Sequence, residues 1–291
     1  MAVNVKNGFL KVENKWNNQE LDQPLQILIL NLMPTKEVTE RQFLNILAVL
    51  NQDVEVTFLY PQTHHFKTVD QDRVAKCYCS LQDVYDNYYD GLIITGAPVE
   101  QLDFQDVDYW NEFLAIKQWS TNHVGQTINE CWASQAALYC DFAIPKTELK
   151  QKLFGIYQAS SINPNCRLCN NLSRFVNPQS RHSQSLINRE SLPTELTIVA
   201  DNQFTGPLIL HSDAKRQTYL TGHPEYSLDT LDTEYHRDLA KNSVIDAPAN
   251  YYDRKHQIEN TWQNSSIQLY QNWVDLIESE EFNYDRKAIA L

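Results

Sequence analysis

A cysteine at the expected start of a helix is the clearest sign of chemistry in this sequence. Residues 124–128 form a short uncharged run with β-branched residues, as expected at the end of a buried strand, and the small residues 133–138 that follow Cys131 favour a helix. A thiol on such a strand-to-helix turn lies beside the free N–H groups of the helix, which favour a thiolate and offer donors to an oxyanion. The alternative is a buried cysteine that only fills space.

A histidine and a glutamate follow another expected strand, over residues 217–220. His223 lies two residues before Glu225, so its imidazole is suited to act as a general base while the carboxylate orients it. Separately, these residues have ordinary explanations as a hydrogen-bonded loop histidine and a solvated carboxylate. Together with Cys131 they predict a Cys-His-Glu set for covalent acyl chemistry.

Alternating strands and helices predict how these residues are positioned. We expect strands over 25–32, 54–59, 92–94 and 124–128, and helices over 36–50, within 72–87 and around 110–114. This order is typical of an α/β fold with a doubly wound, mainly parallel sheet. Ligands of such sheets bind beyond the carboxyl ends of the strands, where Gly96, Cys131 and His223 all fall.

The second half of the chain is less regular. Residues 158–193 are polar and contain two Asn-Pro turn signals, which predict a long irregular region. Strands should resume at 196–200 and 217–220, and apolar stripes predict helices over 228–239 and 267–276. We therefore expect an N-terminal lead-in segment over 1–24 and a single domain over 25–291 with C-terminal helical additions.

Composition excludes several classes of protein. The 291 residues include 42% hydrophobic ones, which suits a folded globular protein. The formal net charge is -13 without a basic run, so we expect no nucleic-acid partner. No signal peptide or membrane-spanning run is apparent, so we expect no membrane association and a cytoplasmic location. Only 7 glycines occur, without a Gly-rich phosphate loop.

Four of the six cysteines have spacings that invite a zinc interpretation. Cys166-Arg-Leu-Cys169 has the spacing of a zinc knuckle, and Cys77-Tyr-Cys79 would complete four ligands. However, a CxC pair is not the usual second half of such a site, and no glycine turn flanks it. We therefore expect no metal site, and no disulfides in a reducing compartment.

Four motifs resemble the homoserine O-acyltransferase family of methionine biosynthesis, and the likeness covers about residues 25–273. The motifs are Cys131-Trp-Ala-Ser-Gln-Ala-Ala137, Gly222-His-Pro-Glu-Tyr226, Asn31-Leu-Met-Pro34 and Thr95-Gly-Ala-Pro-Val-Glu100. The resemblance implies a glutamine amidotransferase-like fold, which is a flavodoxin-like three-layer arrangement. It also implies ping-pong transfer of an acyl group, with acetyl-CoA as a co-substrate and no tightly bound cofactor. We further expect a homodimer that acts on small molecules.

The resemblance also assigns roles to individual residues. Cys131 would carry the acyl group as a thioester, His223 would deprotonate the acceptor hydroxyl, and Glu225 would support the histidine. The backbone N–H groups of Trp132 and Ala97 would form the oxyanion hole.

Substrate-binding residues of the family correspond to Lys152, Ser180 and Arg237 in this chain. Arg237 suits a carboxylate, Ser180 a polar head group and Lys152 an anion. Each also has an ordinary explanation as a solvated or loop residue, and the helical pattern leaves open whether Arg237 faces solvent or a cleft.

Glu100 corresponds to a family position where Glu accompanies acetyl transfer and Gly accompanies succinyl transfer. A glutamate fills the space that the longer chain needs, and its charge opposes a succinyl carboxylate. Two like charges about 4 Å apart at an effective dielectric constant near 20 repel by roughly 4 kcal/mol. The resemblance therefore implies acetyl-CoA as the donor.

Some positions depart from the family pattern and leave the acceptor open. Gln179 stands where His is common, His182 where Tyr is common, and residues 262–266 replace the usual Trp-Arg-x-His. Serine is the competing acceptor, because a pocket distinguishes one methylene by only about 1–3 kcal/mol. Succinyl-CoA is the competing donor. Glutamine amide hydrolysis, and a scaffold with a redox-sensing Cys131, are the competing functions outside acyl transfer.

Overall fold

A sheet flanked by helices forms the body of the computed structural model, which describes residues 2–67, 69–241 and 244–279. In the described residues the main sheet has nine strands in the order β1-β3-β2-β4-β5-β11-β10-β9-β7, and β6 and β8 form a separate two-stranded sheet. The strands are β1 (Val3–Val5), β2 (Leu25–Leu30), β3 (Val54–Leu59), β4 (Tyr89–Ile94), β5 (Val124–Glu130), β6 (Lys146–Gln158), β7 (Ser161–Ile162), β8 (Val176–Ser185), β9 (Thr197–Asn202), β10 (Gly206–Ser212) and β11 (Gln217–Leu220). The helices are α1 (Phe9–Val12), α2 (Lys36–Leu47), α3 (Gln71–Cys77), α4 (Trp110–His123), α5 (Trp132–Phe142), α6 (Thr230–Ala240) and α7 (Gln263–Ser279), with short 3₁₀ turns at Gln82–Val84, Phe104–Asp106 and Arg167–Cys169.

Parallel pairing in the first part of the sheet follows the predicted order. All neighbours from β1 to β11 pair in parallel, and the remaining strands β10, β9 and β7 pair antiparallel. The central strands β2 to β5 are almost completely buried, as the nearly continuous apolar run of β2 predicts for that strand. The mainly parallel α/β fold is therefore confirmed.

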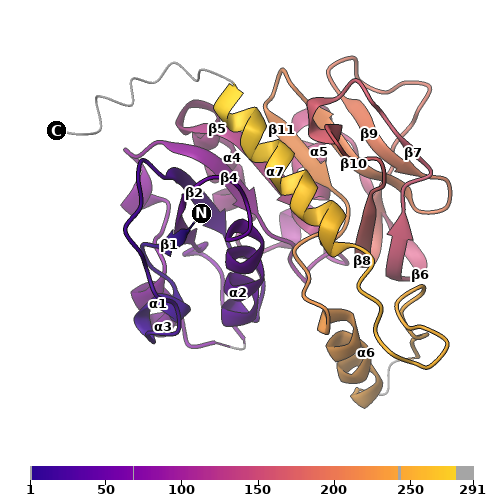
Figure 1. Cartoon of the computed structure of the whole chain (residues 1–291), viewed down its shortest axis with the longest axis horizontal. Helices are drawn as coiled ribbons and strands as arrows, with labels where there is room; N and C mark the ends of the chain where they lie inside the picture. Colours follow the sequence, from indigo (N-terminus) through magenta and orange to yellow (C-terminus); the bar gives the residue numbers. More distant parts are fainter. Residues whose placement is uncertain (1, 68, 242–243, 280–291) are drawn as a thin grey trace.

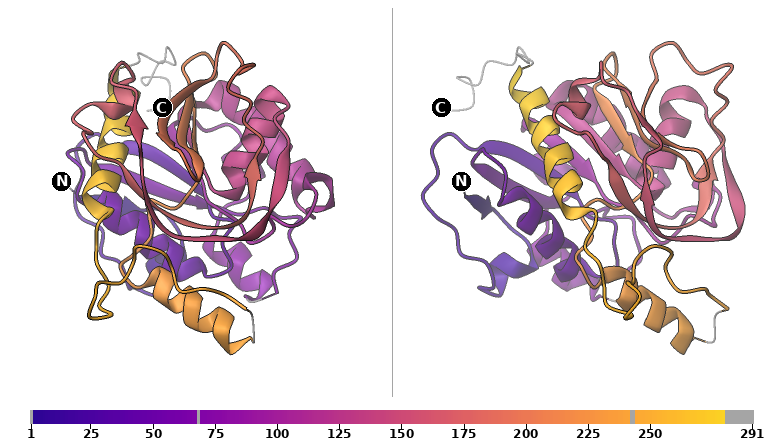
Figure 2. Two further views of the ribbon diagram at one scale, coloured as in Figure 1. Left: turned by 90° about the vertical axis from the view of Figure 1, so that its right-hand side faces the viewer. Right: turned by 45° about the vertical axis from the view of Figure 1, so that its right-hand side comes forward.

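Helices cover both faces of the sheet and make a three-layer arrangement. One core cluster joins the sheet to α1, α2 and α7, and a second joins it to α4 and α5. In Figure 1, α7 crosses in front of the sheet while α4 and α5 lie behind it. Helix α6 projects from the body in both views of Figure 2. Of the helices in the described part of the chain, none has the length and apolar character needed to cross a bilayer.

The prediction of an irregular region over residues 158–193 is wrong where β7 and β8 lie, while most of the other residues in this range form no helix or strand. Strands β6 and β8 pair antiparallel over most of their length, with Ile156 opposite Pro178. The inward-facing side chains of β8 are polar, including Asn177, Gln179 and Arg181, so the strand has no apolar alternation to reveal it. Two further strands, β7 and β10, were also missed.

Two smaller expectations need correction. The apolar stripe expected over residues 228–239 is only partly buried, because Leu228 and Leu239 are exposed and Leu231 alone of the three leucines packs inside. The N-terminal lead-in segment contributes β1 to the edge of the main sheet, where Val3 pairs with Val54. The division of the chain at residue 24 stays a prediction.

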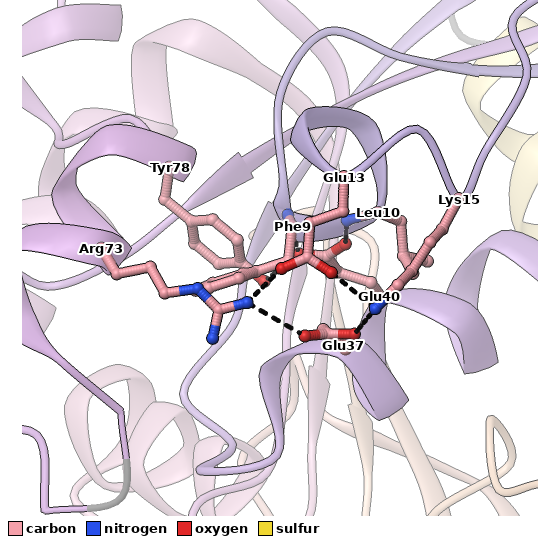
Figure 3. Close-up of polar contacts among 8 residues, drawn as sticks. All are labelled: Phe9, Leu10, Glu13, Lys15, Glu37, Glu40, Arg73 and Tyr78. Atoms are coloured by element: carbon pink, nitrogen blue, oxygen red, sulfur yellow. Dashed lines mark hydrogen bonds and ion pairs between the residues drawn. The ribbon is translucent and has the colours of Figure 1, made fainter.

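A buried glutamate fixes the N-terminal helix to the sheet. Glu40 of α2 accepts hydrogen bonds from the backbone N–H groups of Phe9 (2.7 Å) and Leu10 (2.8 Å) at the start of α1, and from the Tyr78 hydroxyl (2.8 Å). Figure 3 shows this arrangement beneath a surface cluster of ion pairs. The ion pairs join Glu13, Lys15, Glu37 and Arg73.

Candidate active site

Cys131 occupies the turn between β5 and α5, as predicted. Its backbone has φ 48° and ψ -112°, an unfavourable conformation for a residue with a side chain. The turn is held on the neighbouring strand, because the Cys131 N–H donates to the carbonyl of Leu220 over 2.8 Å. This geometry directs a nucleophile away from the sheet at the beginning of a helix.

His223 and Glu225 form a buried pair beside Cys131. The imidazole Nδ1 donates to Glu225 Oε1 over 2.8 Å, and both residues are at most 5% exposed. The ring of Tyr226 stacks on the imidazole with centroids 4.2 Å apart. The Cys131 side chain lies close enough to the imidazole to act on its charge. The predicted Cys-His-Glu set is therefore brought together in the described structure.

The environment of the set shifts the proton affinity of its members. Burial alone lowers the pKa of His223, but the charge and hydrogen bond of Cys131 raise this pKa more, so the net direction is upward. Burial raises the pKa of Glu225 to about 8. A histidine with a raised pKa beside a thiol favours a thiolate–imidazolium pair.

Gly96 makes room for this contact. A Cβ at Gly96 would lie 2.8 Å from His223 Cε1 and 3.2 Å from Cys131 Cβ, so any side chain would push the two apart. The next residue is Ala97, which is buried, and Trp132 is the first residue of α5. The first N–H groups of a helix have no partner within the helix, so that of Trp132 is suited to bind an oxyanion. The oxyanion hole itself stays a prediction.

Comparisons with known proteins agree with this geometry. A family model described as "Homoserine O-succinyltransferase" matches residues 2–284. A homoserine O-acetyltransferase of Streptococcus thermophilus is 40% identical over 283 residues, which cover 96% of this chain and 90% of the relative. One of Acetivibrio thermocellus is 38% identical over 287 residues, which cover 96% and 93%.

The chain belongs to the homoserine O-acyltransferase family. It is thus an acyltransferase, as the motifs predicted. Two solved glutamine amidotransferases share its fold. The one from Thermotoga maritima has a TM-score of 0.54 and 12% identity, covering 88% of this chain and 100% of that one. The one from Methylobacillus flagellatus has a TM-score of 0.57 and 12% identity, covering 91% and 99%.

Two of the three predicted substrate-binding residues of this acyltransferase meet at a residue that the sequence analysis missed. Glu234 of α6 accepts a hydrogen bond from Ser180 Oγ over 2.5 Å and lies 3.5 Å from Lys152 Nζ. Its other oxygen accepts a bond of 2.7 Å from Tyr226, which stacks on the catalytic imidazole. Glu234 could have been found from its spacing, because it lies one helical turn before the predicted binding residue Arg237.

Arg237 lies away from that cluster. Its side chain is 52% exposed, and its guanidinium pairs with the neighbouring Asp238 at 2.9 Å. Asp238 in turn binds Lys152 at 3.0 Å, so Arg237 is joined to the others only through this carboxylate. The substrate-binding roles of all three residues stay predictions.

Glu100 lies on the turn after β4 and is partly buried. Its carbonyl accepts a hydrogen bond from Lys146 at the start of β6, and the Lys146 ammonium also lies close enough to interact with its carboxylate. The turn follows the same strand end that carries Gly96, which agrees with a position near the acyl group. Its role in donor choice stays a prediction.

A second missed residue immediately precedes the nucleophile. Glu130 is completely buried at the end of β5 and accepts a hydrogen bond from the Tyr270 hydroxyl of α7. Side-chain atoms of Glu130, His223 and Glu225 lie within 4.8 Å of one another. A charged residue at the end of an otherwise uncharged strand was a signal in the sequence.

The four cysteines considered for zinc do not form a site in the described residues. No group of three or more closely placed ligand atoms includes Cys77, Cys79, Cys166 or Cys169 in that part of the chain. Cys77 and Cys169 instead belong to the apolar core. Burial raises the pKa of Cys169 to about 12, as expected of an unreactive thiol.

Proposed function

We propose that this acyltransferase moves an acetyl group from acetyl-CoA to the side-chain hydroxyl of L-homoserine. The single observation that carries the proposal is the Cys131 turn with its buried His223–Glu225 pair. The similarity to homoserine O-acetyltransferases of Streptococcus thermophilus and Acetivibrio thermocellus supports the choice of donor and acceptor.

In the first half-reaction the Cys131 thiolate attacks the thioester carbonyl of acetyl-CoA. The carbon–sulfur bond to CoA breaks, and the CoA thiolate takes the proton held by the His223 imidazolium. The product is an acetyl thioester on Cys131. Negative charge on the carbonyl oxygen during this step would be held by the backbone N–H groups of Trp132 and Ala97.

In the second half-reaction neutral His223 accepts the proton of the acceptor hydroxyl while its oxygen attacks the acetyl thioester. The carbon–sulfur bond to Cys131 breaks, which releases the O-acetylated amino acid and restores the thiolate–imidazolium pair. Glu225 stabilises the imidazolium at both stages through its 2.8 Å contact with Nδ1.

The thioester is the step to test first. Mass spectrometry of the protein after exposure to acetyl-CoA without acceptor should find an added acetyl group on the Cys131 peptide. Cys140 lies on the same helix and is exposed, so its peptide serves as the internal control for random acetylation. Full turnover by Cys131→Ala would sink the proposal.

We propose Glu100 as the determinant of the acetyl donor. Because Lys146 partly offsets its charge, the volume of the Glu100 side chain should contribute alongside electrostatic repulsion. Glu100→Gly should move the ratio of kcat/KM values towards succinyl-CoA. Asp106→Gly, which removes an exposed acidic residue a few positions further on that is not among the charges acting on Lys146, is the matched control. An unchanged ratio in Glu100→Gly would remove this role.

We propose that Arg237 binds the carboxylate of the acceptor, that Ser180 binds a polar head group and that Lys152 binds an anionic group of the substrates. Among the described residues the exposed Arg237 guanidinium pairs with the Asp238 carboxylate, which it would exchange for the acceptor. Arg237→Ala should raise KM for the acceptor by about 10- to 100-fold, the usual effect of losing a charged hydrogen bond. His236→Ala, a change at the neighbouring exposed residue, should leave KM for the acceptor unchanged.

Serine is the competing acceptor because positions around Ser180 depart from the family pattern. One of them, Gln179, is buried and accepts a 2.8 Å hydrogen bond from Arg181, so it shapes the strand beneath Ser180. Thiol release from acetyl-CoA and succinyl-CoA, each with homoserine and then serine, decides donor and acceptor together. A glutamine control measures amide hydrolysis.

We also propose a cytoplasmic homodimer that needs no resident cofactor or metal. Light scattering of the purified protein gives the oligomeric state. Activity that survives dialysis against a chelator would support catalysis by side chains alone.

A further inference from the structure

The buried carboxyl group of Glu130 lies against that of Glu225. Side-chain oxygens of the two carboxyl groups lie within 4.8 Å of each other, and neither residue is more than 5% exposed. Glu130 comes from β5 and Glu225 from the turn after β11, and these strands are parallel neighbours with Glu130 opposite Leu220. The contact is therefore built into the register of the sheet.

One oxygen of each residue is left without a donor. Tyr270 donates to Glu130 Oε1, and His223 donates to Glu225 Oε1. Glu130 Oε2 and Glu225 Oε2 are buried, and no group in the described residues donates to either. Two adjacent buried carboxylates repel strongly, and one proton held between them removes the repulsion and satisfies both oxygens.

The surroundings decide which residue holds the proton. Glu225 is bonded to the imidazole of His223, which can carry a positive charge, whereas Glu130 is bonded to a neutral tyrosine from α7 and acts on the imidazole only at longer range. The Glu234 carboxylate and the Cys131 thiolate are the other charged groups that act on His223 and Glu225. Burial and the Glu225 charge both raise the pKa of Glu130 well above its usual range.

We propose that Glu130 is a positioning residue that stays protonated and donates a hydrogen bond to Glu225, favouring the ionised carboxylate that faces His223. Burial by itself opposes that ionisation and raises the pKa of Glu225, while the hydrogen bond from Glu130 lowers it. Removal of the Glu130 donor should therefore make Glu225 less ionised and the His223 imidazolium less stable. The thiolate of Cys131, which pairs with this imidazolium, should then form less readily.

The test measures the thiolate directly and needs no acyl transfer. The rate of Cys131 alkylation by iodoacetamide is followed from pH 5 to 10 by mass spectrometry of its peptide, in the unchanged protein and in variants. Cys140 in the same digest is the internal control. Glu130→Gln keeps both a donor and an acceptor, whereas Glu130→Met and Glu130→Leu remove the donor and keep most of the volume.

The two kinds of variant should differ. In Glu130→Met the midpoint of alkylation should move upward by about one to two pH units, the usual effect of losing a hydrogen bond to a charged group. In Glu130→Gln it should stay within about half a pH unit, because the amide replaces the acid proton. Near-UV circular dichroism identifies any variant that has lost its fold, and Glu130→Leu then takes the place of Glu130→Met.

Two outcomes overturn the inference. A midpoint that is unchanged in the donor-free variants would reduce Glu130 to a space-filling residue. A midpoint that moves in Glu130→Gln would mean that Glu130 carries the charge. The inference rests on the proposed function only for its catalytic meaning, since failure of acetyl transfer would leave the alkylation profile interpretable.

Discussion

Two buried glutamates in this protein each accept a hydrogen bond from a tyrosine, but they differ in how many further donors they have. The two pairs are Tyr78–Glu40 and Tyr270–Glu130. Glu40 receives three donors, from Tyr78 and two backbone N–H groups, and both of its oxygens are satisfied. Glu130 receives the Tyr270 hydroxyl on one oxygen and faces a second carboxyl group with the other. A carboxylate with a full set of donors anchors a helix, whereas one that lacks a donor remains available to exchange or share a proton.

The largest expected effect is on turnover, which should fall in variants of the His223–Glu225 pair but not in a variant of Glu40. Glu225→Gln and His223→Ala should lower turnover by about 10²–10⁴-fold, the usual value of general acid–base assistance. Glu40→Gln should keep kcat near its normal value, because Glu40 is part of a structural anchor. Steady-state rates with acetyl-CoA and homoserine, beside thermal unfolding curves, check this. Near-normal turnover in Glu225→Gln would break the comparison.

A change at Glu40 should instead reduce stability. Glu40→Leu leaves the Phe9 and Leu10 N–H groups and the Tyr78 hydroxyl buried without an acceptor, at about 1–3 kcal/mol each. We expect the free energy of unfolding to fall by about 3 kcal/mol or more in urea titrations. Glu37→Leu, on the outer side of the same helix, is the control and should change it little.

The pH dependence of stability sharpens the contrast. Burial raises the pKa of Glu225 to about 8 in the folded protein, above its ordinary value of 4.5, so the folded Glu130–Glu225 pair holds an extra proton between these values. The stability that this proton contributes is present below about pH 4.5 and is lost as the pH rises through 8. Relative to Glu225→Gln, the unchanged protein should therefore lose stability from pH 4.5 to 8. A parallel pair of unfolding curves across this range would contradict the shift.

The smallest expected effect is the difference in stability between variants of Tyr78 and Tyr270. Tyr78→Phe removes a donor to Glu40 and also the acceptor of Asn31 Nδ2, so it should lower stability by about 1–2 kcal/mol. Tyr270→Phe removes a single donor to a neutral acid and should lower it by about 1 kcal/mol or less. Urea titrations of both variants measure this. A larger loss for Tyr270→Phe would indicate that Glu130 carries charge.

Much of the parallel sheet, and the positions of Cys131 and His223 on it, could be predicted because both leave local marks in the sequence. An apolar run, an alternating run and short β-branched runs identify β2 to β5, and Cys131 and His223 follow strand ends. The β6–β8 hairpin could not be predicted, since its buried positions hold polar residues such as Gln179 and Arg181 that bind one another. A polar strand of this kind has no hydrophobic period.

The missed carboxylates show a second limit. From the sequence alone, Glu130 and Glu234 would be expected to face solvent. Their buried contacts are made with residues far along the chain. Tyr270 is 140 residues from Glu130, and Ser180 is 54 residues from Glu234. Such contacts are set by how α6 and α7 return to the sheet, which no local pattern specifies.

The packing of α7 against the sheet also has a consequence for the protein during its synthesis. Cys131 leaves the ribosome well before Tyr270, and at roughly 5–20 residues per second the nascent chain carries its nucleophile for on the order of 10 s without the helix that lies over Glu130. A chain broken off before α7 has the thiol but neither the Tyr270 donor nor that side of the core. Full assembly of the Cys131 turn is thereby tied to the synthesis of α7.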